Sequence, residues 1–401
     1  MTTRIDWVGS QCRVLATIAA EFDRTQPFSG LTIGTGIHLE PKTVAMLLTL
    51  RRGGARVLST GNLNTTQPES VAYLNAHGVE AIGEPTQHDS VRNEYIDEIL
   101  AAEPDLLLDN GGDMFARWLE RPYEKLRGGT EETTSGRIRL APLRDRLDLP
   151  ILVINDSPIK QFAENRHAVG QSTVESFLRI TNKATNGRRV VVFGYGGVGK
   201  GVALSFQRAH AYVSVIEVDP VLRMEAMWDG FMVPDRDEAL GEADIVITVT
   251  AARDVVTARD LAILPDGAIL INAGHLPVEI DVAGMAADPG VASYGPTDDG
   301  ISTFRMRDGR SIHLLTDGHM VNLAGPRPQG NSIESMDLGF SLQARCLEAV
   351  AKGEVGRDSC VVPVPRRIDE WVAATYVELA RLRPAAPRTS NAASGGLADA
   401  D

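Results

Sequence analysis

Three glycines, Gly194, Gly196 and Gly199, are spaced as GxGxxG, a pattern that can bring the backbone close to a phosphate group. An apolar run at 189–193 precedes them and a helical pattern at 200–210 follows them. Because these positions carry no side chain, a pyrophosphate can approach the N-terminus of the helix. A glycine turn without a ligand is the alternative, but the order of strand, glycines and helix favours a dinucleotide site.

An acidic residue stands where such a site requires one. A second strand-like run at 212–216 ends at Glu217, 18 residues after Gly199. A carboxylate at this place binds the ribose hydroxyls of a dinucleotide. Because no arginine directly follows Glu217, the sequence favours NAD over NADP.

Short apolar runs alternate with helical patterns along nearly the whole chain. This alternation, with glycines at several helix ends, is typical of α/β proteins with parallel sheets. The expected buried strands are 53–60, 104–112, 149–156, 189–193, 212–216, 243–250 and 267–274. Residues 384–401 are rich in alanine, proline, serine and glycine, and we expect them to form a disordered tail.

Composition excludes some classes of partner. The 401 residues carry 40 basic and 53 acidic side chains, and this net charge of −13 argues against a broad contact with nucleic acid or membrane. The length suggests two or three domains. The N-terminus lacks the apolar core of a signal peptide, so we expect a cytoplasmic protein. The three cysteines are widely spaced, which predicts neither a disulfide framework nor a metal site.

Ten stretches, in order along the chain, resemble the S-adenosyl-L-homocysteine hydrolase family across about residues 5–380. They are GIHLEPKT, LDNGGD, GGTEETTSG, NDSPIKQFAENR, QSTVESFLRITN, GYGGVGKGVA, EVDP, INAGHLPVEID, DGHMVNL and MDLGFSLQ. So many ordered matches are specific for the family.

The resemblance implies an α/β fold with two Rossmann-like domains. A doubly wound parallel sheet that binds NAD, at 161–325, would be inserted into a discontinuous α/β substrate domain. That domain would comprise 1–160 and 326–383, the second part ending in a helix. The resemblance also implies a tightly bound NAD, recycled within one turnover, and a homo-oligomer that is a tetramer or a dimer.

The resemblance also implies a reaction. The 3′-hydroxyl of a nucleoside is oxidised to a ketone, which acidifies the proton on C4′. Loss of that proton expels the C5′ substituent, water adds to the enone, and the ketone is reduced again. Such chemistry needs a base at C4′ and acid or base help at C5′.

Individual residues match positions with known roles in the family. Lys160 matches the lysine beside the 3′-hydroxyl and C4′, where a buried apolar cleft would favour the deprotonated base. Glu132 matches the carboxylate that binds the ribose hydroxyls, whereas the neighbouring Glu131 could equally be a helix cap. His38 matches the histidine near C5′, a candidate proton shuttle, and His275 matches one where cofactor and substrate meet.

The resemblance thus supplies three sets of candidate residues. The catalytic set is His38, Asn110, Glu132, Lys160, Glu164 and His275. The NAD-binding set is Thr133, Thr134, Ser135, Asn165, Gly194, Gly196, Gly197, Val198, Gly199, Glu217, Thr250, Ala251, Asn272, Gly274, His275 and Asn322. The substrate-binding set is His38, Glu40, Lys42, Asn62, Gln67, Asn110, Glu132, Lys160, Glu164 and Leu276.

The chain also departs from the family pattern. Asn110 stands where the family has the second of two aspartates, and an amide cannot exchange a proton at useful pH. Glu164 replaces an aspartate and lengthens the arm, and Leu276 replaces a phenylalanine that gates the pocket. Pro68 follows Gln67 where the family has aspartate, and the family's Gly-His-Pro turn after VNL is absent.

These departures spare the NAD site, the ribose contact and the C4′ base, but alter the C5′ end. We therefore expect a paralog that dehydrates an adenine nucleoside, as in the conversion of psicofuranine to angustmycin A, a nucleoside-antibiotic step. A true S-adenosyl-L-homocysteine hydrolase, giving adenosine and homocysteine, is the first alternative. A catalytically impaired, NAD-binding regulatory homolog is the second.

Overall fold

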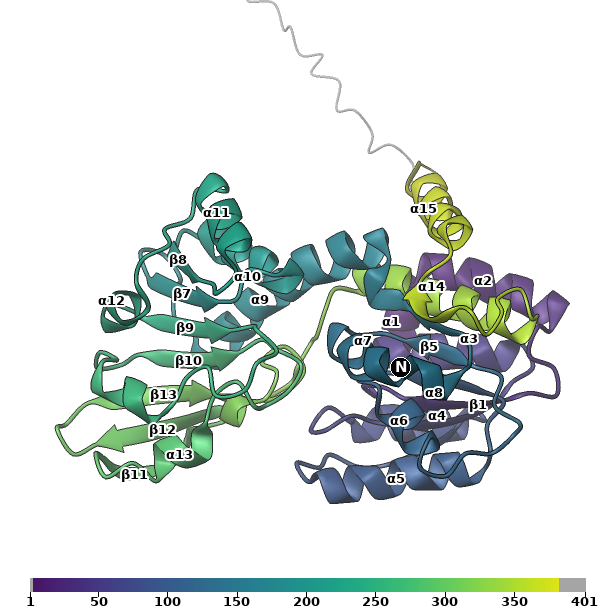
Figure 1. Ribbon diagram of the computed structural model, residues 1–401, viewed down its shortest axis with the longest axis horizontal. Coiled ribbons are helices and arrows are strands. Elements are labelled where there is room, and N and C mark those ends of the chain that lie inside the picture. The colour runs from purple at the N-terminus through teal and green to yellow at the C-terminus, as the bar shows by residue number, and fades with distance from the viewer. Residues whose placement is uncertain (1–2, 382–401) are drawn as a thin grey trace, which may run out of the picture.

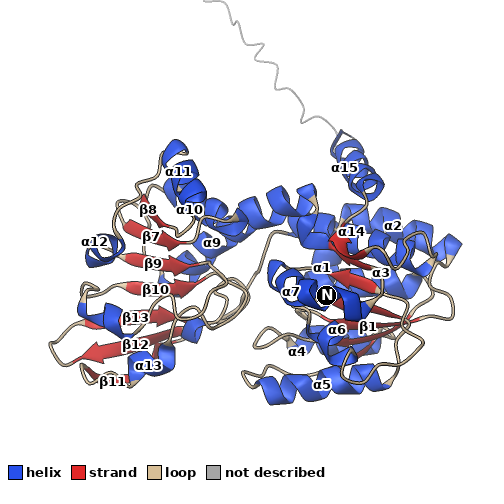
Figure 2. Ribbon diagram, in the orientation of Figure 1, coloured by secondary structure: helices blue, strands red, loops and turns tan. Residues whose placement is uncertain are grey.

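The computed structural model describes residues 3–381, which form two seven-stranded sheets, each flanked by helices (Figures 1 and 2). The predicted fold class, with two Rossmann-like sheets of which one is a doubly wound NAD-binding sheet, is confirmed. The predicted tail, 384–401, lies outside the described residues, and so do residues 382–383 of the predicted substrate domain.

The first sheet is parallel throughout, in the order β3-β2-β1-β4-β5-β6-β14. Its strands are β1 (Thr32–Gly36), β2 (Arg56–Thr60), β3 (Glu80–Ile82), β4 (Leu106–Asp109), β5 (Gly129–Glu131), β6 (Ile151–Val153) and β14 (Cys360–Pro363). The strand order reverses between β1 and β4, where open α/β sheets bind ligands beyond their carboxyl ends.

Helices cover both faces of this sheet. Along β4, Leu106 and Leu108 belong to one apolar core and Leu107 to the other, because successive strand residues point to opposite faces. The first core packs α1 (Arg4–Gln11), α2 (Arg13–Thr25), α3 (Pro41–Arg52), α4 (Pro68–Ala76), α14 (Ile333–Ala351) and α15 (Arg366–Arg381). The second packs α5 (Asp89–Ala101), α6 (Asp113–Trp118), α7 (Thr134–Leu140) and α8 (Arg144–Leu147).

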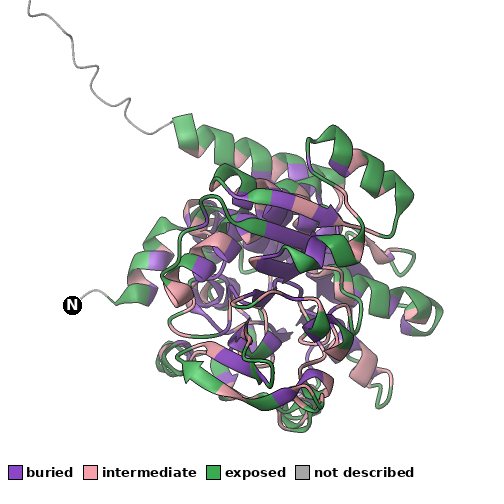
Figure 3. Ribbon diagram, turned by 90° about the vertical axis from the view of Figure 1, so that its left-hand side faces the viewer, coloured by how far each residue is buried: buried purple, intermediate pink, exposed green. Residues whose placement is uncertain are grey.

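The second sheet has the order β11-β12-β13-β10-β9-β7-β8, parallel from β13 to β8 and antiparallel at the β11–β13 end. Its strands are β7 (Arg189–Phe193), β8 (Tyr212–Ile216), β9 (Ile245–Thr248), β10 (Ile269–Asn272), β11 (Val291–Asp298), β12 (Ile301–Met306) and β13 (Ser311–Leu315). Its order reverses between β7 and β9. Figure 3 shows its buried strands between helices with exposed outer faces.

Helices also cover both faces of the second sheet. One core includes residues of α9 (Val169–Thr181), α10 (Gly197–Arg208) and α11 (Pro220–Trp228). The other includes residues of α12 (Arg236–Gly241), η4 (Ala258–Ala262) and α13 (Val282–Ala286). Each sheet therefore has its own pair of cores.

Two segments join the sheets (Figure 1). The first runs from β6 through the short η2 (Ile154–Asp156) into η3, a π-helix at Lys160–Ala168, and then α9. The second leads from η5 (Thr316–Gly318) back to α14, which packs against α2 and α3 of the first unit. β14 then adds a strand beside β6, so a segment near the end of the chain completes the first sheet.

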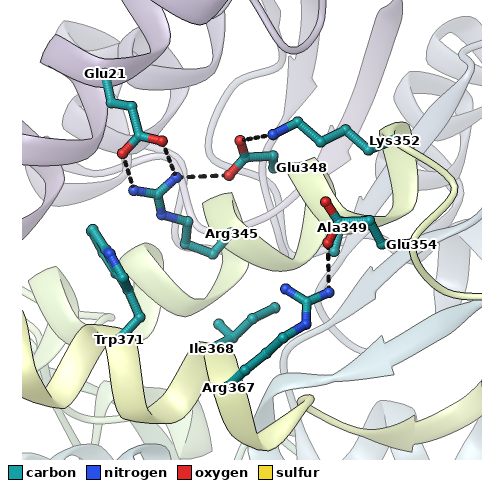
Figure 4. Close-up of a pocket in the computed structure, with 9 residues that line it drawn as sticks. All are labelled: Glu21, Arg345, Glu348, Ala349, Lys352, Glu354, Arg367, Ile368 and Trp371. Atoms are coloured by element: carbon teal, nitrogen blue, oxygen red, sulfur yellow. Dashed lines mark hydrogen bonds and ion pairs between the residues drawn. The ribbon is translucent and has the colours of Figure 1, made fainter.

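A surface depression between α2, α14 and α15 is lined by paired charges (Figure 4). Arg345 binds Glu21 and Glu348, and its guanidinium lies 3.9 Å from the ring centroid of Trp371. This stacking and the ion pairs fix α15 against the first unit. The depression is therefore a helix-docking contact.

Within residues 3–381, no helix is long and apolar enough to cross a membrane. The same residues contain no group of three or more histidine, cysteine or acidic side chains placed to hold a metal ion.

Candidate active site

A cavity of about 320 Å³ lies where the carboxyl ends of the two sheets face each other. The first unit supplies most of the predicted substrate-binding residues, and the second supplies most of the predicted NAD-binding residues. Among the predicted residues, the lining includes His38, Glu40, Lys42, Asn110, Glu132, Thr133, Thr134, Ser135, Lys160, Glu164, Asn165, Gly196, Gly197, Val198, Thr250, Ala251, Gly274, His275 and Asn322.

The glycine turn after β7 has the geometry that a pyrophosphate needs. Gly194 has a φ of +99°, a left-handed conformation that favours glycine. A Cβ on Gly199 would lie 2.1 Å from the carbonyl oxygen of Gly194, so α10 could not pack so close to the strand with any side chain there. Gly196 caps the helix and has open space beside it. The residues present therefore fit the phosphates of NAD.

Two further groups fit the ends of NAD. The carboxylate of Glu217, directly after β8, accepts hydrogen bonds from the backbone N–H groups of Tyr195, Val218 and Asp219, which orient it. At the other end, the Nδ2 of Asn322 donates to Ser172. Its buried Oδ1 has no hydrogen-bond partner among the described residues, and Asn322 lines the cavity. An unpaired acceptor fits the NH₂ group of a nicotinamide carboxamide.

The centre of the cavity holds one buried lysine between two buried glutamates. Lys160 Nζ lies 3.2 Å from Oε1 of Glu132 and also bonds to Glu164. Lys160 and Glu164 lie four residues apart on the π-helix η3, whose wider turn aligns them on one side. Glu132 follows β5 directly. The end of this strand and the π-helix together position the three side chains.

Burial and charge set the protonation of this triad. The carboxylates of Glu164 and Glu132 outweigh burial and raise the pKa of Lys160 above its ordinary value. Burial raises the pKa of Glu164 to about 7, against the opposing charge of Lys160. Our expectation that the cleft would favour a deprotonated Lys160 was therefore wrong for the substrate-free enzyme, because two carboxylates hold the ammonium.

Glu164 reaches its place only because the facing helix carries a glycine. A Cβ on Gly339 of α14 would lie 1.9 Å from Oε1 of Glu164. That oxygen is buried and has no hydrogen-bond partner among the described residues. The sequence comparison missed Gly339, although it lies in the matched stretch MDLGFSLQ.

Asn110, which the resemblance predicts at the C5′ end of the substrate, is held on both sides of its amide. Its Nδ2 donates to Oε2 of Glu132 at 2.6 Å, and its Oδ1 accepts from Nδ2 of Asn62 at 2.8 Å. A carboxylate at this position would place a second negative charge against Glu132. Asn110 therefore orients Glu132 here and offers no titratable proton.

Two partly buried histidines face the same end, with ring centroids 5.7 Å apart. Burial, with smaller effects of His275 and Arg92, lowers the pKa of His38 well below its ordinary value. Burial and Arg92 lower the pKa of His275 to about 4. Both rings are therefore neutral near pH 7, so His38 is a poor reservoir of the proton that we expected it to deliver.

The hydrogen bonds around His38 select its tautomer. Thr65 donates its hydroxyl proton to the carbonyl oxygen of Asn62, so its oxygen accepts from Nδ1 of His38, 2.7 Å away. Nε2 then carries no proton. In the resting enzyme His38 can accept a proton or a hydrogen bond.

A buried ion pair forms another wall of the cavity. Nζ of Lys42 lies 2.8 Å from Oε2 of Glu40 and donates to the carbonyl oxygen of Gln329, also at 2.8 Å. This contact ties α3 to the loop that lacks the family's Gly-His-Pro turn. Arg4 of α1 binds the side chain of the same Gln329.

Seven predicted residues do not line the cavity: Asn62, Gln67, Gly194, Gly199, Glu217, Asn272 and Leu276. Asn62 acts through Asn110, whereas Asn272 binds the carbonyl oxygens of Leu276 and Gly318 and so shapes the loop after β10. Lining residues that sequence reasoning missed are Ile37, Thr43, Asn155, Gln161, Val169, Val249, Ala273, Met320, Leu323, Asn331, Met336 and Phe340. Most are apolar or small and carry no chemical signal of their own.

The pKa of Glu164 leads to an expected pH dependence. If its carboxylate accepts the proton that Lys160 must lose, kcat/KM falls about tenfold per pH unit below about 7, as Glu164 becomes protonated. Glu164→Gln should lower activity and remove this limb. Asp109, outside the cavity, has a pKa raised to about 7 by burial, so a limb that persists in Glu164→Gln would assign the titration elsewhere.

Known proteins match the chain over nearly its whole length. The family model described as S-adenosyl-L-homocysteine hydrolase matches residues 3–123, and that of its NAD binding domain matches 165–327. S-inosyl-L-homocysteine hydrolase of Methanopyrus kandleri is 37% identical over 382 residues, or 93% of this chain and 89% of that protein. Adenosylhomocysteinase of Thermotoga maritima is 37% identical, over 92% of each chain.

The paired Rossmann-like sheets, the glycine turn and the buried triad define a two-unit, NAD-dependent class of proteins. The chain belongs to the S-adenosyl-L-homocysteine hydrolase family, and its cofactor is NAD. The predicted resemblance is thereby confirmed.

Proposed function

We propose that the protein oxidises the 3′-type hydroxyl of a purine nucleoside, removes the C4′ proton and eliminates the C5′ substituent. The observation that carries this proposal is the buried group of Lys160, Glu132 and Glu164 beside the dinucleotide turn. Bound NAD supplies the hydride acceptor and later the hydride donor. Glu132 binds the sugar hydroxyls. Lys160 and Asn110 each donate to one of its oxygens and so hold the carboxylate in one orientation for the sugar.

Proton transfer within the triad prepares the base. Glu164 bonds to Lys160 directly and, with a pKa of about 7, accepts the proton that Lys160 must lose. The resulting amine takes the hydroxyl proton as the hydride leaves for NAD and releases it to solvent, and it then takes the proton from C4′. The C4′–H electron pair forms the C4′–C5′ double bond as the C5′ substituent departs with its bonding pair. The proton remains on Lys160, next to the departing group.

We further propose that the C5′ substituent is a hydroxyl, so that the protein is a lyase of the psicofuranine to angustmycin A type, acting in nucleoside-antibiotic biosynthesis. Asn110 favours this reading because the family's carboxylate at C5′ is absent. The hydroxyl leaves as water with the proton from Lys160, while Nε2 of His38 accepts a hydrogen bond from it. Final reduction of the ketone leaves an exocyclic enol ether.

Hydrolysis of a homocysteine thioether is the second candidate, because relatives named S-inosyl-L-homocysteine hydrolase and adenosylhomocysteinase are 37% identical to this chain. Under that candidate, the neutral His38 would act as a base on the incoming water. A regulatory NAD-binding homolog is a third candidate, which turnover of any nucleoside by the purified protein would dismiss.

Asn110→Asp tests which substituent leaves. We expect the variant to gain hydrolysis of S-adenosylhomocysteine by at least about tenfold, because a carboxyl group restores acid and base chemistry at C5′. Released homocysteine can be followed with a thiol reagent. Asn186→Asp, at an exposed position that does not line the cavity, is the matched control for the charge change. An unchanged hydrolysis rate in Asn110→Asp would contradict the role we give this position.

We also propose that the protein is a homo-oligomer, a tetramer or a dimer, in the cytoplasm. Exposed apolar side chains gather from β8 to the segment after α11, including Val218, Met227 and Trp228, which are 94%, 63% and 87% exposed. Such a group supports a contact between copies of the chain. Light scattering should give a mass above that of one chain, and Trp228→Glu should lower it; a monomeric wild type would contradict the proposal.

A further inference from the structure

A buried arginine outside the cavity connects with the C5′ end through two amides. Arg92 lies on α5 and is 6% exposed. Its Nη2 donates to Oδ1 of Asn62 at 2.9 Å, and its Nη1 binds Asp113 at 2.7 Å. Asn62 in turn donates to Asn110, and Asn110 donates to Glu132. One unbroken hydrogen-bond chain therefore runs from α5 to the carboxylate that we assign to the sugar.

The direction of this chain is fixed at its start. A guanidinium can only donate, so Oδ1 of Asn62 must face Arg92 and its Nδ2 must face Asn110. Oδ1 of Asn110 then faces Asn62, and its Nδ2 faces Glu132. If either amide turned over, two acceptor oxygens or two NH₂ groups would meet in a buried place, which is costly.

We propose that Arg92 is a positioning residue that holds Asn62 and Asn110 in the single amide orientation in which Asn110 donates to Glu132. Its effect on substrate rests on the proposed function, because Glu132 is the group assigned to the sugar hydroxyls. Arg92 matters in this protein because Asn110 is an amide, whose two ends differ. A carboxylate has two equivalent oxygens, so it has no orientation to select. Arg92 and Asn110 thus form a matched pair.

Three variants test this role. Arg92→Leu removes the donor, Arg92→Lys keeps a cation that can donate to Asn62, and Arg117→Leu is the matched control. Arg117 of α6 pairs with Asp97 of α5, so it joins the same two helices without touching the amide chain. All three are measured as NAD-loaded full-length protein.

The first measurement needs no substrate. In protein labelled with ¹⁵N-asparagine, the side-chain NH₂ protons of Asn62 and Asn110 should exchange with deuterated water slowly in wild type and in Arg117→Leu. They should exchange roughly 10- to 100-fold faster in Arg92→Leu, since a buried hydrogen bond is lost, and near the wild-type rate in Arg92→Lys. Equal exchange in wild type and Arg92→Leu would overturn the proposal.

The second measurement uses adenosine as a probe of binding and of the oxidation step. Arg92→Leu should weaken binding and slow NADH formation, each roughly 10- to 100-fold, with substantial rescue in Arg92→Lys. In an Asn110→Asp background, Arg92→Leu should weaken adenosine binding and slow NADH formation much less. An equal cost in both backgrounds, or no rescue by lysine, would reduce Arg92 to a structural residue. Wild type that neither binds nor oxidises adenosine, but shows the exchange pattern above, would refute the proposed function and leave the positioning role standing.

Discussion

Lys160→Met should reduce turnover of the nucleoside substrate by roughly 10²- to 10⁴-fold, the usual contribution of a positioned base. Methionine keeps the length and apolar stem of the side chain but removes the group that takes the C4′ proton. It also leaves Glu132 and Glu164 without the cation between them, so nucleoside binding should change at the same time. The rate is measured by mass spectrometry of the product.

The control for this variant is Lys125→Met, which removes a partly exposed lysine paired with the buried Asp105 of the same unit. It should keep turnover within about twofold of wild type, since Asp105 keeps Arg127 and the backbone N–H of Thr32 as partners. NAD content should be equal in wild type and both variants, because Lys160 is not part of the glycine turn. If Lys160→Met turned over at the wild-type rate with full NAD content, the assignment of the C4′ base would be wrong.

Gly339→Ala should lower turnover roughly 10- to 100-fold although it adds only one methyl group. The new Cβ would lie 1.9 Å from Oε1 of Glu164, so the carboxylate must shift from the place where it binds Lys160. Such a shift disturbs a catalytic group that depends on close placement. Turnover and its pH profile are both measured, since displacement of Glu164 should also shift the acid limb near pH 7.

A second substitution should rescue this variant. Glu164→Asp shortens the arm by one methylene and makes room for the alanine, so the double variant should recover most of the activity lost in Gly339→Ala. Gly9→Ala, on α1 with nothing within 4 Å of its Cβ position, is the neutral control. A double variant slower than both single variants would show that the contact between Gly339 and Glu164 is not the cause.

Much of the fold follows from local patterns in the sequence. The strands predicted at 189–193 and 212–216 coincide with β7 and β8, because each is an apolar run with clear ends. The longer predicted strand at 104–112 is shorter in the structure, at Leu106–Asp109, since the glycines after it form the turn into α6. The dinucleotide turn was recognisable because its glycines are required by backbone geometry.

Other parts of the site depend on contacts between distant segments. Gly339 and Glu164 meet only when α14 returns to the first unit, so neither residue alone indicates the pairing. The protonation of Lys160 depends on two carboxylates that fold beside it and keep it charged. Burial of the lysine alone would predict a deprotonated amine. Arg92 carried a usable signal: with Ile96 and Ile99 it occupies the buried face of α5, an unusual place for an arginine.

The most direct test of the proposed dehydration is product analysis of the purified NAD-loaded protein with three nucleosides. Psicofuranine, S-adenosylhomocysteine and S-inosylhomocysteine are supplied separately, and products are followed by mass spectrometry. We expect psicofuranine to lose one molecule of water without net consumption of NAD, at a rate well above release of homocysteine from either thioether. Rapid release of homocysteine, with psicofuranine left intact, would contradict it.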